Sequence, residues 1–243
     1  MASKLSKVVI IGGNGFVGQN ICRSAMKFGL DVVSISRSGA PNTNQPWKSK
    51  VKWVSADIGE NIEWADELKE ASAVVSCLGA FGSDEFMERV NGDYNIKVVS
   101  EAIKAGVSRF VYVSTVENNL PSFVLRGYFN GKRRAEEAVL DGFPDTGTIL
   151  RPGFMYGDRQ VGPVTLPLGI VGRPLQSLLS LPGASTLQSL PGMKALLASP
   201  LPVQEVGLVA AAAAAGRKDL SLSLSGVLRV EDIQLLAKML SNK

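Results

Sequence analysis

A glycine-rich stretch near the start of the chain, VVIIGGNGFVG (residues 8–18), constrains the fold more than any other feature. Its first four residues are apolar and β-branched, which predicts a buried parallel strand. Apolar residues recur at helical spacing from Phe16 to Phe28, and Gly29 follows them, which predicts a helix directly after the glycines. A strand, a glycine turn and a helix in this order are typical of a nucleotide-binding unit whose helix N-terminus receives a phosphate.

The glycines of this stretch fit two spacings at once. Gly13, Gly15 and Gly18 form G-x-G-x-x-G, whereas Gly12, Gly15 and Gly18 form G-x-x-G-x-x-G. The second spacing agrees better with the candidate site residues described below, and it leaves Gly13 as an extra loop glycine. In this spacing Gly12 would allow the tight turn, Gly15 the approach of a pyrophosphate, and Gly18 the close packing of helix on strand. The predicted phosphate-binding turn comprises Gly12, Asn14, Gly15, Phe16, Val17 and Gly18.

Strands and helices are expected to alternate along the rest of the chain. Strands are predicted at residues 31–36, 51–55, 73–78, 109–114 and 146–150, and helices at 84–105, 131–140, 203–215 and 230–240. This alternation predicts an α/β fold with a doubly wound parallel sheet of the Rossmann type, formed by residues 1–243 as a single domain. A ligand crevice is then expected at the carboxyl ends of the strands.

The composition of the sequence changes over residues 155–202. Between Gln160 and Gln204 the only charged residues are Arg173 and Lys194, and prolines recur throughout. No proline-free run approaches the ~20 residues that a transmembrane helix needs. We expect a small apolar lobe of loops and short helices before the C-terminal helices. It would serve either as a cap on the sheet edge or as an apolar substrate pocket or membrane-surface contact.

Composition excludes several classes of function. The chain of 243 residues has two cysteines outside any CxxC motif and no histidine, so a zinc site, another metal site and a histidine-based triad are not expected. The net charge of +4 is compatible with an anionic cofactor or an acidic membrane surface, but no basic run indicates nucleic acid. About six residues precede the first strand, so we expect either a cytosolic protein or one whose targeting segment is absent from this chain.

The end of the second predicted strand distinguishes between cofactors. NAD sites usually place an acidic residue there, but this chain has Arg37, which can pair with a 2′-phosphate and stack on adenine. NADP(H) is therefore favoured over NAD(H). Asp57, with Ile58 beside it, follows the third strand and is expected either to accept from the adenine amino group or to cap its own loop.

A candidate catalytic set lies further along the chain. Tyr128 and Lys132 are one helical turn apart, and Ser114 and Thr115 end the preceding strand. The lysine ammonium would lower the pKa of the phenol, so that the tyrosine could exchange a proton with a carbonyl oxygen. Ser114 or Thr115 would orient that oxygen. The alternative is an interfacial tyrosine and a helix-surface lysine. Arg133 and Arg134 could add to the positive field beside the tyrosine, although we expect them to face solvent.

Three segments together resemble the extended and atypical short-chain dehydrogenase/reductase superfamily. They are VVIIGGNGFVGQNI, VNGDYNIKVVSEAIKAGVSRFVYVS and LRPGFMYG. The resemblance implies that Asn91 supports the active site, that Leu78 and Gly79 line the nicotinamide side, and that Ser114 or Thr115, Tyr128 and Lys132 occupy catalytic positions. It also places Lys132 on the nicotinamide ribose, and Pro152 and Phe154 at the turn into the substrate lobe and beside the cofactor.

Two further segments are most similar to the atypical branch of this superfamily. That branch contains the nucleotide-binding accessory subunit of mitochondrial complex I and a mitochondrial ubiquinone-biosynthesis protein. The two segments are GYFNGKRRAEEAVL and SPLPVQEVGLVAAAA. This implies an organellar location, in mitochondrion or plastid. The first hypothesis is an NADP(H)-dependent oxidoreductase for a hydrophobic carbonyl or quinone-like substrate. The second is a non-catalytic NADP(H)-binding subunit of a membrane-associated complex. A sugar-nucleotide epimerase or reductase of the extended class is the third and weakest, because the apolar lobe does not suit a sugar diphosphate.

Overall fold

A computed structural model describes residues 6–116, 125–161, 164–167 and 200–242, and for residues 158–167 it describes the backbone alone. Seven strands form one parallel sheet in the order β11-β6-β5-β4-β1-β2-β3. They are β1 (Lys7–Ile11), β2 (Asp31–Ser36), β3 (Val51–Ser55), β4 (Ala71–Ser76), β5 (Arg109–Val113), β6 (Gly147–Leu150) and β11 (Gly226–Leu228).

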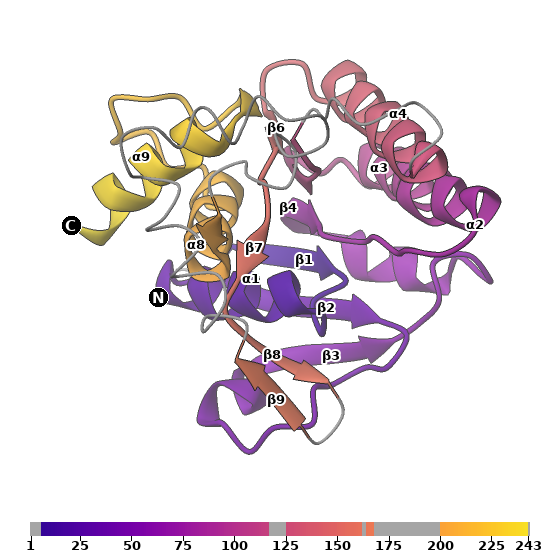
Figure 1. The fold of residues 1–243 in the computed structure, drawn as a ribbon, viewed down its shortest axis with the longest axis horizontal. Helices are drawn as coiled ribbons and strands as arrows, with labels where there is room; N and C mark the ends of the chain where they lie inside the picture. Colours follow the sequence, from indigo (N-terminus) through magenta and orange to yellow (C-terminus); the bar gives the residue numbers. More distant parts are fainter. Residues whose placement is uncertain (1–5, 117–124, 162–163, 168–199, 243) are drawn as a thin grey trace, which may run out of the picture.

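Helices cover both faces of the sheet (Figure 1). One face carries α1 (Phe16–Lys27), α8 (Val203–Ala214) and α9 (Val230–Ser241), and the other carries α2 (Asp84–Glu88), α3 (Tyr94–Lys104) and α4 (Arg126–Gly142). Short 3₁₀ helices, η1 (Pro46–Lys50) and η2 (Glu63–Leu68), precede β3 and β4. The expected doubly wound α/β fold is confirmed. Its strand order reverses between β1 and β4, where such folds bind their ligands.

The alanine-rich helix α8 packs closely on α1. All of its alanines are buried, and a Cβ atom added at Gly207 would lie 2.8 Å from the backbone carbon of Asn20. Small side chains are therefore required here because the two helix backbones nearly touch. This packing fixes α1, and with it the glycine turn that precedes α1.

Three elements differ from the expectation. Strand β11 was missed, because three residues at a sheet edge carry too short a pattern to be distinguished from a loop. Helix α4 begins at Arg126, five residues earlier than expected. The helix expected at residues 84–105 is interrupted by a π-helical turn, η3 (Arg89–Asp93), which places Asn91 in a widened turn of the helix.

The described parts of the expected apolar lobe are strands. β7 (Met155–Tyr156) pairs with β10 (Leu201–Pro202), and β8 (Asp158–Val161) forms an antiparallel hairpin with β9 (Val164–Pro167). The remainder of the lobe, residues 168–199, lies outside the described residues. Within the described ranges, no helix combines the length and apolar character needed to cross a bilayer. In the same ranges, no three Cys, Asp or Glu side chains lie together as a metal site would require.

Candidate functional site

The glycine turn between β1 and α1 adopts the geometry of a phosphate-binding loop. Gly12 has φ +83°, a conformation that favours glycine, and the Gly15 N–H donates to the Gly12 carbonyl over 2.9 Å. A Cβ atom at Gly18 would lie 2.2 Å from that same carbonyl oxygen, so only glycine fits there. No side chain caps the N-terminus of α1 at Gly15, so the N–H groups of its first turn can face an anion.

Gly13 lies in the turn, as expected, and its lack of a side chain is needed for packing. A Cβ atom at this position would lie 2.2 Å from Ser34 Oγ and 2.8 Å from Ser34 Cβ. Ser34, on the adjacent strand β2, packs directly under the turn. Both Gly12 and Gly13 are therefore required, for backbone conformation and for packing respectively.

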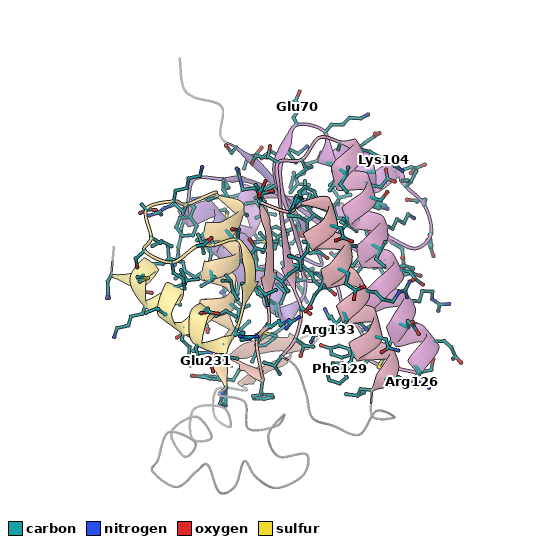
Figure 2. All side chains as sticks on the ribbon, turned by 90° about the horizontal axis from the view of Figure 1, so that it is seen from above. Glu70, Lys104, Arg126, Phe129, Arg133 and Glu231 are labelled. Carbon is teal, nitrogen blue, oxygen red and sulfur yellow. The ribbon has the colours of Figure 1, made fainter. Side chains whose placement is uncertain are left out.

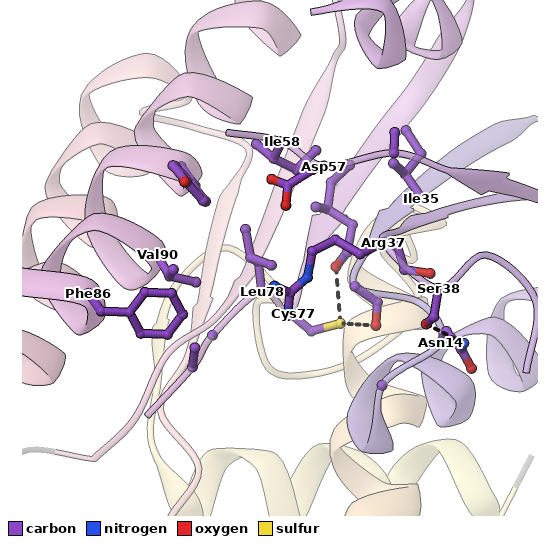
Figure 3. A pocket seen from close by; sticks show the side chains of 18 residues that line it. Asn14, Ile35, Arg37, Ser38, Asp57, Ile58, Cys77, Leu78, Phe86 and Val90 are labelled. Carbon is purple, nitrogen blue, oxygen red and sulfur yellow. Dashed lines mark hydrogen bonds between the residues drawn. The ribbon is translucent and has the colours of Figure 1, made fainter. Parts of the chain in front are cut away.

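The turn borders a cleft of about 330 Å³ at the carboxyl ends of β1, β2, β3 and β4. Figure 3 shows the cleft running from Asn14 and Ser38 on one side to Phe86 and Val90 on the other. The structure brings eight of the predicted cofactor-binding residues together in its lining: Gly12, Asn14, Gly15, Arg37, Asp57, Ile58, Leu78 and Gly79.

Arg37 lies at the end of β2 and points into this cleft (Figure 3). Its side chain is exposed and forms no ion pair with the other described residues. Next to it, the Asn14 amide donates to Ser38 Oγ over 2.8 Å. Arg37, Ser38 and Asn14 all line the cleft, and the Arg37 guanidinium extends into it toward Leu78 (Figure 3), where a cation can bind an anionic group.

Asp57 lines the cleft and also stabilises its own loop. Its Oδ1 accepts a hydrogen bond from the Gly59 N–H over 2.8 Å, which is the loop-capping alternative left open by the sequence. The second carboxylate oxygen has no hydrogen-bond partner among the described residues, so the same side chain can still accept a bond from a ligand.

The opposite wall of the cleft was not predicted from the sequence. Phe86, Val90 and Tyr94 line it from α2, η3 and the start of α3. Their spacing of four residues forms an apolar stripe along one helical face, and this signal could have identified them. Ser38 was also missed, although it directly follows Arg37. Cys77, at the base of the cleft, directs its thiol to the carbonyls of Ile11 and Gly12 over 3.2 and 3.4 Å.

Lys132 lies at the other end of the site, where β4 and β5 end. Its side chain is 4% exposed, and Nζ donates to the carbonyl oxygens of Val113 over 2.9 Å and Leu78 over 3.3 Å. Nζ also lies 4.7 Å from the ring centre of Tyr112. Burial lowers the pKa of Lys132 to about 8, because the charged form loses its hydration. The ammonium therefore ties the ends of two strands together.

Glycines on α4 allow Lys132 to reach these carbonyls. A Cβ atom at Gly127 would lie 2.0 Å from the carbonyl oxygen of Asp84, and one at Gly131 would lie 2.8 Å from the backbone nitrogen of Gly92. Helix α4 therefore lies directly against α2 and η3. Each glycine immediately precedes a candidate catalytic residue, so the same contact positions Tyr128 and Lys132.

Asn91, in the π-helical turn, holds the loop that follows β4. Its amide nitrogen donates to the carbonyls of Ala80 and Met87 over 2.9 and 2.7 Å, and its oxygen accepts from the Ala80 N–H over 3.3 Å. The Asn91 carbonyl in turn accepts from the Tyr112 hydroxyl over 3.1 Å. Asn91 thus fixes the backbone between Gly79 and the rest of the site.

The Tyr128 phenol behaves differently from the expectation. Burial raises its pKa, while a polar contact with Thr115 and the charge of Arg133 lower it less strongly. The expected lowering by Lys132 is wrong: Lys132 Nζ lies 5.9 Å from the Tyr128 ring centre and donates to backbone carbonyls instead. The ring of Tyr128 stacks on Phe81 at 4.8 Å and 13°.

Ser114 and Thr115 have separate surroundings. The Ser114 side chain is 4% exposed, and its Oγ has no hydrogen bond of regular geometry among the described residues. Ser114 lies close enough to the Glu136 carboxylate to lower the pKa of that group. Thr115 faces Tyr128. Thr115 is therefore the better placed of the two to orient a substrate oxygen beside the phenol.

A buried ionic cluster behind these residues was not found in the sequence. The Glu136 carboxylate accepts from Arg151 Nε over 3.1 Å and from Arg151 Nη2 over 2.6 Å, and it also pairs with Arg133 Nη1. Burial raises the pKa of Glu136, but the hydrogen bonds of Arg151, the Ser114 contact and Arg133 together lower it below its usual value. The prediction that Arg133 faces solvent is wrong, because its guanidinium turns inward to this carboxylate.

The remaining predicted residues do not line the cleft. Pro152 is buried and its carbonyl accepts from the Val116 N–H over 3.0 Å, whereas the Phe154 side chain is 43% exposed. Also outside the cleft lining are Phe16, Val17, Gly18, Asn91, Ser114, Thr115, Tyr128 and Lys132. Figure 2 shows Arg126, Phe129 and Arg133 on α4 at the end of the molecule away from Glu70 and Lys104.

The fold and the cleft define a dinucleotide-binding protein of the Rossmann type. A family model described as NAD(P)H-binding matches residues 12–171, and the chain belongs to that family. Among its relatives is the uncharacterized chloroplastic protein At1g32220 of Arabidopsis thaliana, 43% identical over 84% of this chain and 70% of the relative. Another is MIOREX complex component 2 of Saccharomyces cerevisiae, 29% identical over 65% of this chain and 76% of the relative.

Solved structures of the dehydrogenase and epimerase superfamily share the fold. UDP-glucuronic acid 4-epimerase from Bacillus cereus in complex with NAD superimposes with a TM-score of 0.61 at 17% identity, covering 98% of this chain and 85% of that one. A putative NAD-dependent epimerase/dehydratase from Bacillus halodurans gives 0.52 at 24% identity, covering 65% and 74%. At these identities the likeness concerns the architecture alone.

Proposed function

We propose that this protein binds NADP(H) and is an oxidoreductase acting on a hydrophobic carbonyl or quinone-like substrate. The observation that carries the cofactor preference is the Arg37 guanidinium, which points into the cleft at the end of β2 without a protein partner among the described residues. Arg37, with Ser38 and Asn14, would hold the 2′-phosphate. The glycine turn and the first turn of α1 would hold the pyrophosphate.

The residues at the other end of the site suit proton transfer. Bound NADPH would supply the hydride for reduction of a carbonyl carbon. The raised pKa of Tyr128 keeps the phenol protonated at neutral pH, so Tyr128 would act as the proton donor to the substrate oxygen. Thr115 would orient that oxygen. Lys132 would hold the ends of β4 and β5 in place beside the nicotinamide ribose.

An exposed aromatic side chain at this end favours an apolar substrate. Phe81, which stacks on Tyr128, is 69% exposed. Relatives are named as chloroplastic or mitochondrial proteins, which supports an organellar location for this chain. A link to ubiquinone or respiratory metabolism is part of the proposal.

A non-catalytic NADP(H)-binding subunit is the second candidate, and two observations favour it. The polar groups of Lys132 and Asn91 donate to the protein's own backbone, and a relative is named as a component of a complex. In this role the nucleotide would stabilise the fold by mass action, and the apolar lobe would dock on a membrane or a larger complex.

A Tyr128→Phe variant tests the proposal. NADPH binding is followed by nucleotide fluorescence, and turnover by NADPH oxidation with a short-chain ubiquinone analogue and a panel of apolar ketones. We expect the variant to keep its affinity for NADPH and to lose roughly 100-fold or more in kcat, since it lacks the proton donor. Unchanged turnover would remove Tyr128 from the mechanism. Tight NADPH binding by the wild type without turnover on any of these compounds would favour the second candidate.

A further inference from the structure

Arg133 is the inward-facing member of a pair of neighbouring arginines on α4. Its Nη2 donates to the carbonyl oxygens of Thr115 over 2.8 Å and Val116 over 3.3 Å, while its Nη1 pairs with Glu136. One guanidinium thus connects a buried carboxylate with the backbone that carries Thr115. Arg134, the next residue, pairs at the surface with Glu88 and Asp93.

The buried partner of Arg133 is itself held firmly. The Glu136 side chain is 4% exposed and receives two hydrogen bonds from Arg151, whose side chain is 15% exposed. The backbone N–H of Arg151 donates to the Leu228 carbonyl over 2.9 Å, which links β6 to β11. Arg133 is therefore oriented by a carboxylate that is bound to the central sheet, and this restricts the orientation of its guanidinium.

The other charged groups near Tyr128 that the structure describes form their polar contacts elsewhere. Lys132 donates to backbone carbonyls at the ends of β4 and β5. On the side of α2, Arg126 and Asp84 form a long pair of 3.8 Å between exposed side chains. Arg134 engages Glu88 and Asp93 from α2 and η3. Burial raises the pKa of Tyr128, and the Thr115 contact and the charge of Arg133 lower it less strongly. Tyr112 is a further titratable group near the phenol, and its own pKa is raised by burial and then by Tyr128.

We propose that Arg133, held by Glu136 and Arg151, is the positioning residue that sets the Thr115–Tyr128 pair, a task that the sequence spacing would give to Lys132. The guanidinium fixes the backbone of Thr115 and Val116 and places its charge near the phenol. Lys132 has a different task, which is to join the ends of β4 and β5. The effect of Arg133 on turnover rests on the proposed function, whereas its effect on the pH at which Tyr128 ionises does not.

The direct test is the ionisation of Tyr128 in the NADPH-free protein, followed by fluorine NMR after incorporation of fluorotyrosine. The chain has four tyrosines, and the Tyr128 signal is assigned from its absence in Tyr128→Phe. We expect Arg133→Gln to move the ionisation of Tyr128 to higher pH, because a cation that favours the phenolate is removed. Arg134→Gln, a matched change one residue away, is expected to leave it in place.

The conservative variant separates charge from geometry. Arg133→Lys keeps the charge but cannot hold the carboxylate and two carbonyls together. We expect its Tyr128 ionisation to stay closer to the wild type than that of Arg133→Gln, while its kcat falls about tenfold and its KM for NADPH changes by less than about twofold. Should Arg133→Gln not fold, Arg133→Lys together with Arg134→Gln carries the test through kcat and the Tyr128 signal.

Two results would overturn the proposal. One is a Tyr128 ionisation that is the same in Arg133→Gln, Arg134→Gln and wild type. The other is an Arg133→Lys variant with wild-type kcat and wild-type Tyr128 ionisation. A wild-type protein without turnover would contradict the proposed oxidoreductase function, but a shifted Tyr128 ionisation in Arg133→Gln would still support the role of Arg133.

Discussion

The two ends of the site use their polar groups in opposite ways. One end of the site, with Arg37 and the glycine turn, is proposed to bind the adenosine and its phosphates (the adenosine end), and the other, with Tyr128 and Lys132, is proposed to be catalytic (the catalytic end). At the adenosine end, Arg37 is exposed and no side chain caps the start of α1. At the catalytic end, Lys132 and Glu136 are each at most 4% exposed and direct their hydrogen bonds to the protein itself. Polar groups that a fold leaves without partners are available to a ligand, whereas satisfied buried groups fix a geometry.

This difference means that cofactor binding and substrate turnover are proposed from different observations. We propose that the adenosine end binds an anion, because Arg37 is exposed to the cleft and forms no ion pair with the other described residues. The catalytic end is a rigid frame that holds one half-buried phenol, Tyr128, against Thr115 and Phe81. Variants at the catalytic end should therefore change stability and pH dependence, and variants at the adenosine end should change ligand affinity.

The largest effect on stability is expected at Glu136. Glu136→Gln leaves Arg133 and Arg151 beside each other without the carboxylate that neutralises them, so we expect a loss of about 3 kcal/mol in the free energy of unfolding. Urea denaturation at neutral pH measures it. The control is Glu137→Gln, since Glu137 is exposed and forms no ion pair among the described residues. Equal stability of the two variants would mean that the cluster does not hold the catalytic end.

A smaller effect is expected from the buried charge of Lys132. Its pKa is about 8 in the folded protein against an ordinary value of 10.5, so the unfolded chain binds more protons between these values. The cost of burying the charge is fully present below pH 8 and is relieved as the pH rises. From pH 7 to pH 9 the wild type should therefore gain about 1 kcal/mol relative to Lys132→Met, which has no such titration.

Urea denaturation of both proteins at a series of pH values up to 9 gives this comparison. Staying at or below pH 9 limits the opposing contribution of Cys77, whose pKa burial raises to about 12. If the difference in the free energy of unfolding between wild type and Lys132→Met stayed constant over this pH range, the ammonium of Lys132 would not be desolvated in the folded protein.

The adenosine end could be predicted from the sequence because its signals are local. The glycine turn, Arg37 and Asp57 each follow closely after a strand, and parallel strands bring their carboxyl ends to one edge of the sheet. The fold class followed from the same alternation of strands and helices. Short-range patterns were sufficient wherever a residue's role depends on its position along one element.

The catalytic end could be predicted only in part because its contacts join distant residues. Tyr128 and Lys132 were found from their spacing, but the carbonyls that accept from Lys132 belong to Leu78 and Val113, which lie at the ends of two strands. The pairing of Glu136 with Arg151 depends on how α4 crosses the end of β6. No local pattern encodes these contacts, and so the direction of the Tyr128 pKa shift was predicted wrongly.

We propose that Arg37 selects NADP(H), and competitive titration of NADPH and NADH measures this preference. We expect the wild type to bind NADPH more tightly than NADH, and Arg37→Glu to weaken NADPH by roughly 100-fold while NADH changes little, because only NADPH carries the 2′-phosphate. Lys48→Glu, the same charge change at an η1 residue outside the cleft lining, should leave both affinities unchanged. Equal weakening of NADPH and NADH by Arg37→Glu would contradict the claim.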